Sequence, residues 1–387
     1  MVRSNPETCP ELVSGPGSVE TIPDMVEDGS WTSVLLVCGK HSFESSGAVR
    51  ILDPLQRRVR VDRWSEFVPN TAAGDLHEGL KVLHAADPDV VIGIGGGSAM
   101  DLAKLLCGFD GITDVGTLES AITSGRRLQH RRRALILAPT TSGTGSEATH
   151  FSTVYIGQEK YSVAGEGLRA DAVVLDPELS MSASPYQKAT SGIDAVAQAI
   201  ESLWAVGATP DSRRFARRAL RHLLPNIEAF IHDPSVENAS AMSVGSHLAG
   251  RAIDISRTTA AHALSYAITQ KYGVSHGHAV ALTLGSFLEA HADASPEQLQ
   301  PGVDPGRHAQ VMEEILGRLA AKSGVEARRR FRDLMTRLGL ETGLSAVGID
   351  SAERRDGVAT SVNVERLGNN PVVFDQAELR DLLDSSN

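Results

Sequence analysis

The 387-residue sequence has little cysteine, no long apolar run and fewer basic than acidic residues. Its cysteines, Cys9, Cys38 and Cys107, are scattered and show neither a disulfide framework nor a metal-site spacing. No segment is long and apolar enough to cross a membrane, and the first residues lack the apolar core of a signal peptide. We therefore expect a soluble protein of the reducing cytoplasm.

The shortage of positive charge narrows the range of partners. Lys and Arg number 37 against 48 Asp and Glu, which gives a net charge of −11. Nucleic acid and anionic membranes bind extended basic surfaces, so neither is expected here. A small basic pocket for an anionic small molecule remains compatible with this charge.

The chain is about twice the length of a typical domain, so we expect two domains. In the first half, short apolar runs alternate with helical patterns, which predicts βαβ units and a largely parallel sheet. From about residue 185 the strand patterns stop and helical periodicity takes over. The predicted domains are an α/β domain over 1–180 and an all-helical domain over 181–387.

Individual elements of the first half follow from the same patterns. Strands are expected at 33–39, 58–64, 90–98, 134–141 and 171–177, with a hairpin formed by 151–157 and 161–165. Helices are expected at 42–58 and 74–89.

A glycine-rich turn joins the strand at 90–98 to a helix. Gly95, Gly96 and Gly97 let backbone approach a phosphate closely, and the helix N-terminus offers free N–H groups. Ser98 is expected to cap that helix, with Asp101 as a capping-box partner. The spacing is not the full G-x-G-x-x-G pattern, so a tight strand-to-helix turn is the alternative to a dinucleotide site.

A second loop of small and hydroxyl-bearing residues, 138–149, also follows a predicted strand. Ligands of open α/β sheets bind at the carboxyl ends of strands. We therefore expect this loop to contact the cofactor, with an ordinary loop as the alternative. The candidate contacts are Thr140, Thr141, Ser142 and Thr144.

Four polar side chains in the second half form a possible metal set. Asp194 and Gln198 lie four residues apart in a predicted helix over 190–204, so both point from one mostly apolar face. A buried carboxylate needs a positive partner. His262 and His276 lie on consecutive predicted helices separated by Gly273, and such N and O donors suit a divalent metal. The alternative is histidines that are satisfied within the core.

The chain resembles the iron-containing (group III) alcohol dehydrogenases over most of its length. The resemblance implies an N-terminal dinucleotide-binding α/β domain and a C-terminal all-α domain, the dehydroquinate synthase-like fold. The segments that carry it are GPGSVETIP (15–23), GGGSAMDLAK, PTTSGTGSE (139–147), LDPEL (175–179), GIDAVAQAIES, the region of His262 with SHGHAVAL, and ERLGNNP (365–371).

The resemblance implies a metal held by Asp194, Gln198, His262 and His276, with Fe(II) expected and Zn as the alternative. The family usually has His where this chain has Gln198. It also has His and Asn where this chain has Tyr266 and Val280. A Gln carbonyl is a neutral and weaker donor, so a lower metal affinity is expected.

Several segments are similar to the branch of the family that reduces phosphonoacetaldehyde, which also carries Gln at this position. The implied reaction transfers hydride from NAD(P)H to the aldehyde and yields 2-hydroxyethylphosphonate, in phosphonate natural-product and antibiotic biosynthesis. The metal would stabilise the developing alkoxide, with His262 among its ligands. His278 or a water on the metal would supply the proton.

An anionic substrate needs fixed donors. We expect Arg257 and Lys160 to bind the phosphonate, with Thr258 and Ser265 as hydroxyl donors. The alternative for both basic side chains is a solvated surface charge.

The end of the first predicted strand should set cofactor choice. It carries Gly39, Lys40 and Ser42, with no acid to repel a 2′-phosphate, so NADPH is favoured and NADH tolerated. Lys40 could instead be an ordinary surface lysine. The resemblance also implies a homodimer.

Three other functions remain open at this point. One is a dehydrogenase for another small aldehyde, an alcohol, lactaldehyde or a phosphonopyruvate-like substrate. Another is a lyase of the dehydroquinate synthase type, although the chain has fewer basic and metal-binding residues than such an enzyme needs. The last is a non-catalytic dinucleotide-binding protein that lost its metal through Gln198.

Overall fold

The structure, a computed structural model, describes residues 10–386. Their contacts divide the chain into two compact units. The first unit extends to Ser184 and also includes Pro234–Gly250, whereas the second comprises Pro185–Asp233 and the chain from Arg251 onward.

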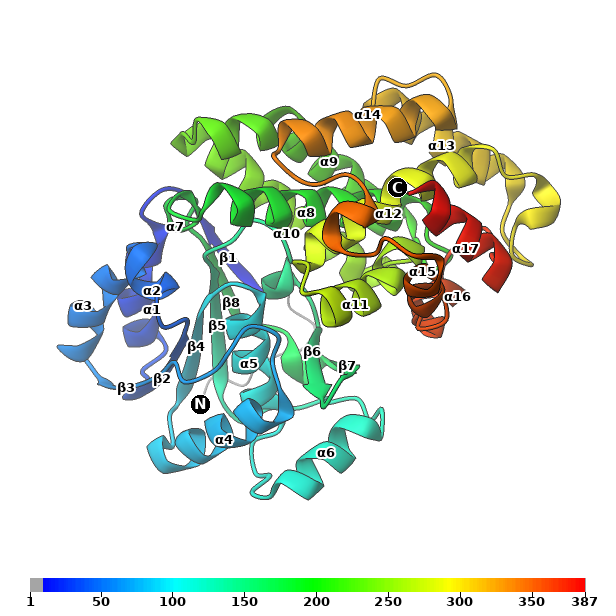
Figure 1. Ribbon diagram of the computed structural model, residues 1–387. Helices are drawn as coiled ribbons and strands as arrows, with labels where there is room; N and C mark the ends of the chain where they lie inside the picture. Colours follow the sequence, from blue (N-terminus) through cyan, green and yellow to red (C-terminus); the bar gives the residue numbers. More distant parts are fainter. Residues whose placement is uncertain (1–9, 387) are drawn as a thin grey trace. The chain divides into compact units, whose positions relative to one another are not determined.

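A six-stranded parallel sheet forms the centre of the first unit, in the order β1-β8-β5-β4-β2-β3 (Figure 1). The apolar runs predicted all of these strands except β1, an edge strand whose side chains are largely exposed. The strands are β1 (Glu11–Ser14), β2 (Ser33–Cys38), β3 (Arg60–Trp64), β4 (Val90–Gly95), β5 (Ala134–Pro139) and β8 (Ala172–Leu175).

Helices cover both faces of this sheet, so its central strands are buried on both sides. In β2, Leu35 and Val37 join the core on one face, while Val34 and Leu36 join the core on the other. The first core includes residues of α4 (Ala73–Ala86), α5 (Gly97–Gly108) and α6 (Val115–Thr123). The second includes residues of α1 (Ile22–Asp28), α2 (Ser42–Ser45), α3 (Leu52–Gln56) and α7 (Glu178–Met181).

The helix predicted over 42–58 is wrong as a single element. Gly47 adopts a left-handed φ of 78°, which ends α2 and starts a short 3₁₀ turn, Ala48–Ile51, before α3. The predicted hairpin is confirmed: β6 (Phe151–Ile156) pairs antiparallel with β7 (Glu159–Ala164).

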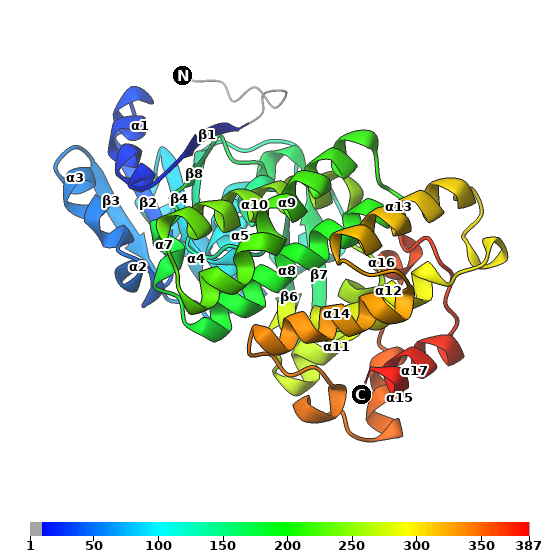
Figure 2. The same cartoon turned by 90° about the horizontal axis from the view of Figure 1, so that it is seen from above.

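The second unit is helical, and its described residues contain no β-strand. Helix α8 packs against α9 and α12, and α12 also packs against α11 and α14 (Figure 2). Its helices are α8 (Pro185–Trp204), α9 (Pro210–His232), α11 (Ala260–Tyr272), α12 (His276–Ala292), α13 (Pro305–Arg318), α14 (Gly324–Arg337), α15 (Ala352–Ala359), α16 (Val364–Gly368) and α17 (Gln376–Ser385). Helix α10 (Val236–Ser256) begins in the first unit and ends in the second.

Two predicted boundaries in the second unit are confirmed. Gly273 ends α11 with a left-handed φ of 69°, and α12 begins at His276. This short connection places the two histidine-bearing helices next to each other in the fold.

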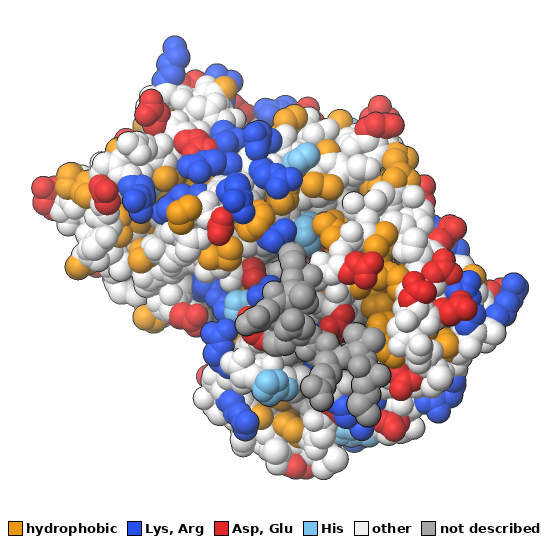
Figure 3. Space-filling view, turned by 180° about the vertical axis from the view of Figure 1, so that it is seen from behind, with side chains coloured by type: hydrophobic (Ala, Val, Ile, Leu, Met, Phe, Trp, Pro, Cys, Tyr) orange, Lys and Arg blue, Asp and Glu red, His pale blue; other side chains and the backbone are white. Residues whose placement is uncertain are grey.

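The surface carries charges of both signs. On the face drawn in Figure 3, Lys and Arg side chains gather in one region although the chain as a whole is acidic. Among the described residues, no helix combines the length and the apolar character that a membrane span requires.

Candidate functional site

The first part of the candidate site is one face of α8. Asp194 and Gln198 are both buried, and the amide nitrogen Nε2 of Gln198 donates a hydrogen bond of 3.0 Å to Oδ2 of Asp194. The four-residue spacing therefore brings the two side chains into direct contact on one face of α8. The role of the Gln198 carbonyl oxygen as a metal ligand stays a prediction.

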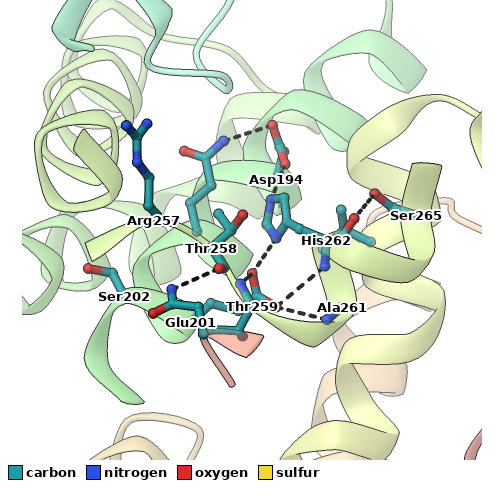
Figure 4. A network of polar contacts seen from close by, with 12 residues as sticks. Asp194, Glu201, Ser202, Arg257, Thr258, Thr259, Ala261, His262 and Ser265 are labelled. Atoms are coloured by element: carbon teal, nitrogen blue, oxygen red, sulfur yellow. Dashed lines mark hydrogen bonds and ion pairs between the residues drawn. The ribbon is translucent and has the colours of Figure 1, made fainter. Parts of the chain in front are cut away.

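His262, near the start of α11, faces this pair. Its Nε2 lies 3.3 Å from Oδ1 of Asp194, and its Nδ1 forms a short contact with the carboxylate of Glu201 (Figure 4). Burial lowers the pKa of His262, but the nearby carboxylates of Glu201 and Asp194 outweigh burial and raise it to about 10. Burial raises the pKa of Glu201, but His262 and neighbouring N–H groups lower it overall. The pair is thus a buried histidine–carboxylate contact.

His276, the first residue of α12, completes a three-residue cluster. One ligand atom from each of Asp194, His262 and His276 lies within 4.8 Å of the others. Gly277 allows this approach, because a Cβ at that position would lie 2.0 Å from the carbonyl oxygen of Thr190 in α8. A bulkier residue would hold α12 away from α8 and His276 away from Asp194.

This donor set fits a divalent metal. Two ligands that each lie about 2.1 Å from one ion are at most about 4.2 Å apart, so small side-chain movements bring the three donors to one ion. The Nε2 of His262 is buried and, among the described residues, faces Oδ1 of Asp194 at 3.3 Å without an aligned hydrogen bond, as expected of an atom that is directed at a ligand. One carboxylate and two imidazoles suit Fe(II) or Zn.

Ser265 contacts His276, the third member of the cluster. Its hydroxyl donates to the carbonyl oxygen of His262 at 2.8 Å, and its oxygen lies 3.3 Å from Nδ1 of His276. The oxygen is therefore available to accept from Nδ1, which leaves Nε2 of His276 as the donor atom for a metal. The contact of Ser265 with the phosphonate stays a prediction, and within the protein its hydroxyl donates to His262.

His278 has partners on both ring nitrogens. Nε2 lies 2.8 Å from the carbonyl oxygen of Glu341, and Nδ1 lies 3.2 Å from the hydroxyl of Tyr186. A carbonyl oxygen only accepts, so Nε2 carries the hydrogen in this contact. Burial lowers the pKa of His278, which favours the neutral ring.

Arg257 lies directly after α10 in an unusual backbone conformation. Its φ of 62° is in the left-handed region, which is rare for a residue other than glycine. Asn369 holds this loop, since its Nδ2 donates to the carbonyl oxygens of Ser256 at 2.8 Å and Thr258 at 3.0 Å.

The cofactor candidates of the first unit also lie close together. The loops after β4 and β5 pack against each other, because a Cβ on Gly97 would lie 3.0 Å from Cγ2 of Thr144 and one on Gly96 would lie 3.6 Å from Thr141. A Cβ on Gly95 would lie 3.7 Å from the backbone nitrogen of Gly39, after β2. Three neighbouring parallel strands thus present their loops at one edge of the sheet.

The predicted capping box at the start of α5 is wrong. Gly96 is the N-cap, and Ser98 lies inside the helix, where its hydroxyl accepts from the backbone nitrogen of Asn70. Asp101 instead accepts from the Ser146 hydroxyl at 2.5 Å and from Thr153, as part of a buried group with Lys104 that braces the second loop.

The other predicted residues lie as follows. Lys40 is exposed and pairs with Glu66 at 3.5 Å, and Ser42 begins α2. Lys160 lies on β7 of the first unit with its ammonium over the ring of Tyr155. Thr140 and Ser142 are buried, with the Ser142 hydroxyl 3.5 Å from that of Ser180.

Sequence reasoning missed two residues that organise the site, Glu201 and Asn369. Glu201 lies three residues after Gln198 in the segment QAIES, so an acid on an otherwise apolar helix face was the available signal. Asn369 lies in ERLGNNP, a motif that gave no hint of the loop it holds. Its contacts with residues 256 and 258 are more than a hundred positions away in the chain.

Family models match nearly the whole chain. The model of iron-containing alcohol dehydrogenase matches residues 9–177, and the model of the C-terminal region of the Fe-containing alcohol dehydrogenase family matches residues 188–387. The chain therefore belongs to the iron-containing alcohol dehydrogenase family. It is an NAD(P)-dependent alcohol dehydrogenase or aldehyde reductase.

Individual relatives show how close the likeness is. The chain is 32% identical over 312 residues to phosphonoacetaldehyde reductase of Streptomyces viridochromogenes, covering 78% of this chain and 77% of that protein. It is 30% identical over 348 residues to long-chain-alcohol dehydrogenase 1 of Geobacillus thermodenitrificans, covering 87% and 85%. The crystal structure of sulfoacetaldehyde reductase from Bifidobacterium kashiwanohense in complex with NAD+ matches with a TM-score of 0.85 at 26% identity, covering 97% of this chain and 96% of that one.

Proposed function

We propose that this enzyme reduces phosphonoacetaldehyde to 2-hydroxyethylphosphonate with NAD(P)H and a divalent metal, in phosphonate natural-product biosynthesis. The observation that carries the proposal is the convergence of Asp194, His262 and His276 on one point of the second unit, with Asp194 and His262 buried and His276 half-buried. In this proposal residues 1–180 bind the dinucleotide, and residues 181–387 bind the metal and the substrate. The working form is a homodimer.

Asp194, His262 and His276 would hold the metal, with the Gln198 carbonyl oxygen as a fourth candidate. A divalent metal supplies Lewis acidity at the carbonyl oxygen, and Fe(II) or Zn both suit these donors. Glu201 and Ser265 orient the two imidazole rings through Nδ1. Burial of Asp194 and His262 strengthens the electrostatic interactions between them, while His276 is half-buried.

Arg257 would bind the phosphonate of the substrate. A strained conformation that neighbouring groups hold in place is often found at ligand-binding positions. A guanidinium offers paired donors to phosphonate or sulfonate oxygens. The named relatives that act on phosphonoacetaldehyde and sulfoacetaldehyde support an anionic two-carbon aldehyde. Thr258 and Lys160 stay further candidates for this contact.

The glycine and threonine loops of the first unit would hold the cofactor. Gly96, Gly97 and the N-terminus of α5 suit the pyrophosphate, and Thr141 and Thr144 lie beside them. Gly39 leaves room for an adenosine 2′-phosphate and Lys40 adds positive charge nearby, which favours NADPH over NADH. His278 would support the packing of its surroundings rather than donate a proton, since both of its nitrogens are engaged.

The deciding experiment measures NADPH and NADH oxidation with three aldehydes: phosphonoacetaldehyde, sulfoacetaldehyde and propanal. The protein is tested anaerobically with Fe(II), with Zn(II) and after chelation. We expect kcat/KM to be highest for phosphonoacetaldehyde and activity to disappear on chelation. A higher kcat/KM for sulfoacetaldehyde or propanal would reassign the substrate, and no NAD(P)H oxidation with any aldehyde would point to a lyase or a binding protein.

A further inference from the structure

Glu201 is a fully buried acid that lies one turn beyond Gln198 in α8. Both of its carboxylate oxygens accept hydrogen bonds from the start of α11. Oε1 accepts from the backbone nitrogens of Ala261 at 2.9 Å and His262 at 3.4 Å. Oε2 accepts from the backbone nitrogen of Thr259 at 3.1 Å and contacts Nδ1 of His262 (Figure 4).

Glu201 does for α11 what a capping side chain usually does. Thr259 is the N-cap residue of α11 but makes no capping hydrogen bond, because its hydroxyl accepts from Nε1 of Trp204 at 2.9 Å. The Glu201 carboxylate takes the free N–H groups of the first turn instead. The helix that carries His262 is therefore docked onto α8 by the same carboxylate that contacts the His262 ring.

We propose that Glu201 is a positioning residue that sets the metal affinity of His262, an inference that rests on the proposed metal centre. A carboxylate can only accept, so Nδ1 of His262 must carry a hydrogen toward Glu201. In the neutral ring the lone pair then lies on Nε2, which is the atom that faces Asp194. Carboxylate partners of metal-bound histidines raise ligand basicity and fix ring orientation in this way.

Two roles of Glu201 can be told apart. If Glu201 only holds the start of α11, its replacement affects stability, and if it sets the tautomer of His262, its replacement also affects metal affinity. Glu201→Gln keeps the shape and one accepting oxygen for the first turn of α11. If that oxygen serves Ala261, the amide nitrogen meets Nδ1 and shifts the hydrogen of His262 to Nε2. If the oxygen serves Nδ1, a donor meets the Ala261 N–H, and the neutral amide still lacks the charge that raises the basicity of the His262 ring. A purely structural role therefore lowers stability alone, whereas the proposed role lowers metal affinity as well.

The experiment titrates metal-depleted enzyme with Co(II), whose visible spectrum reports nitrogen and oxygen ligation, in the absence of substrate and cofactor. We expect Glu201→Gln to weaken Co(II) binding roughly 10- to 100-fold. Glu201→Asp retains the carboxylate and should bind Co(II) more tightly than Glu201→Gln. Cofactor affinity, measured by NADPH fluorescence, should stay within about twofold in both variants.

The matched control is Glu147→Gln. Glu147 forms a similarly buried contact of 3.2 Å with Nδ1 of His247, but both residues belong to the first unit. It should leave Co(II) affinity unchanged.

Wild-type affinity in folded Glu201→Gln overturns the inference. If Glu201→Gln does not fold, the Co(II) affinity of folded Glu201→Asp decides the matter. An affinity below that of wild type but above that of Asp194→Asn supports the inference. An affinity no higher than that of Asp194→Asn overturns it. Failure of the wild-type enzyme to bind Co(II) would instead remove the proposed metal centre itself.

Discussion

The two candidate sites of this protein are built by different means. In the first unit, backbone and small side chains such as Gly96, Gly97 and Thr144 form the site at the ends of adjacent strands. In the second unit, side chains from three helices meet at one point, two of them buried and one half-buried. Contiguous sequence motifs form the first kind of site, whereas the second depends on how separate helices pack.

The largest effect is expected for a variant that changes the metal cluster but not the cofactor loops. Asp194→Asn keeps the size of the side chain but removes its charge from the metal cluster. Because a metal Lewis acid contributes several kcal/mol to the transition state, kcat should fall at least about 10³-fold. NADPH affinity, measured by fluorescence titration, should change less than about twofold. If the metal-depleted enzyme still turned over substrate, the cluster would have no role in catalysis.

A smaller effect is expected at the proposed anion contact. Arg257→Leu should raise KM for phosphonoacetaldehyde about 10- to 100-fold, since a hydrogen bond to a charged group contributes about 1.5–3 kcal/mol. KM for propanal should not change, because propanal has no anionic group. Arg214→Leu is the control, since Arg214 is exposed on α9 and pairs with Asp211. An unchanged KM in folded Arg257→Leu would exclude this role.

A pair of glycine substitutions tests whether the two sites are independent. Gly277→Ala would place a Cβ 2.0 Å from the Thr190 carbonyl oxygen, and Gly95→Ala would place one 2.7 Å from Cβ of Ala99. Overpacking of this kind costs about 1–3 kcal/mol, so each variant should lose roughly tenfold in affinity. Co(II) binding should weaken only in Gly277→Ala and NADPH binding only in Gly95→Ala. Equal loss of both ligands in both variants would show that the sites are coupled.

The smallest expected effect is on the pH dependence of stability, and it follows from a comparison of two buried histidines of the second unit. His262 has carboxylate partners that raise its pKa, whereas burial lowers the pKa of His291 well below 6.5, with a further lowering by His308. The unfolded chain takes up a proton near pH 6.5 that folded His291 cannot take up. Stability due to His291 is therefore complete above pH 6.5 and falls as the pH drops below it, by about 1.4 kcal/mol per pH unit.

Urea unfolding at pH 7.5, 6.5 and 5.5 measures this slope. His291→Gln should reduce the pH dependence of the free energy of unfolding by the equivalent of about one proton. His130→Gln, at an exposed position, should leave this pH dependence unchanged. Identical slopes in wild type and His291→Gln would show that His291 is not the source of acid sensitivity.

Part of this architecture could be predicted from local sequence. Apolar runs identified the buried strands because a strand covered on both faces must be apolar on both. The edge strand β1 lacked that signal, and the break at Gly47 was missed because helical spacing continues across it. The contacts that Ser265 and Asp101 make within the protein were not predicted either, since a hydroxyl or carboxylate does not reveal its partner in the sequence.

The sequence by itself determined the α/β and helical halves, the glycine loops and the shared helix face of Asp194 and Gln198. These features depend on neighbours within a few positions, where backbone geometry sets which side chains meet. The tertiary structure alone decided that Glu201 and Ser265 orient the two histidines and that Asn369 holds the Arg257 loop. Most of these contacts join residues far apart in the chain, and their hydrogen-bond directions depend on helix packing that no local pattern specifies.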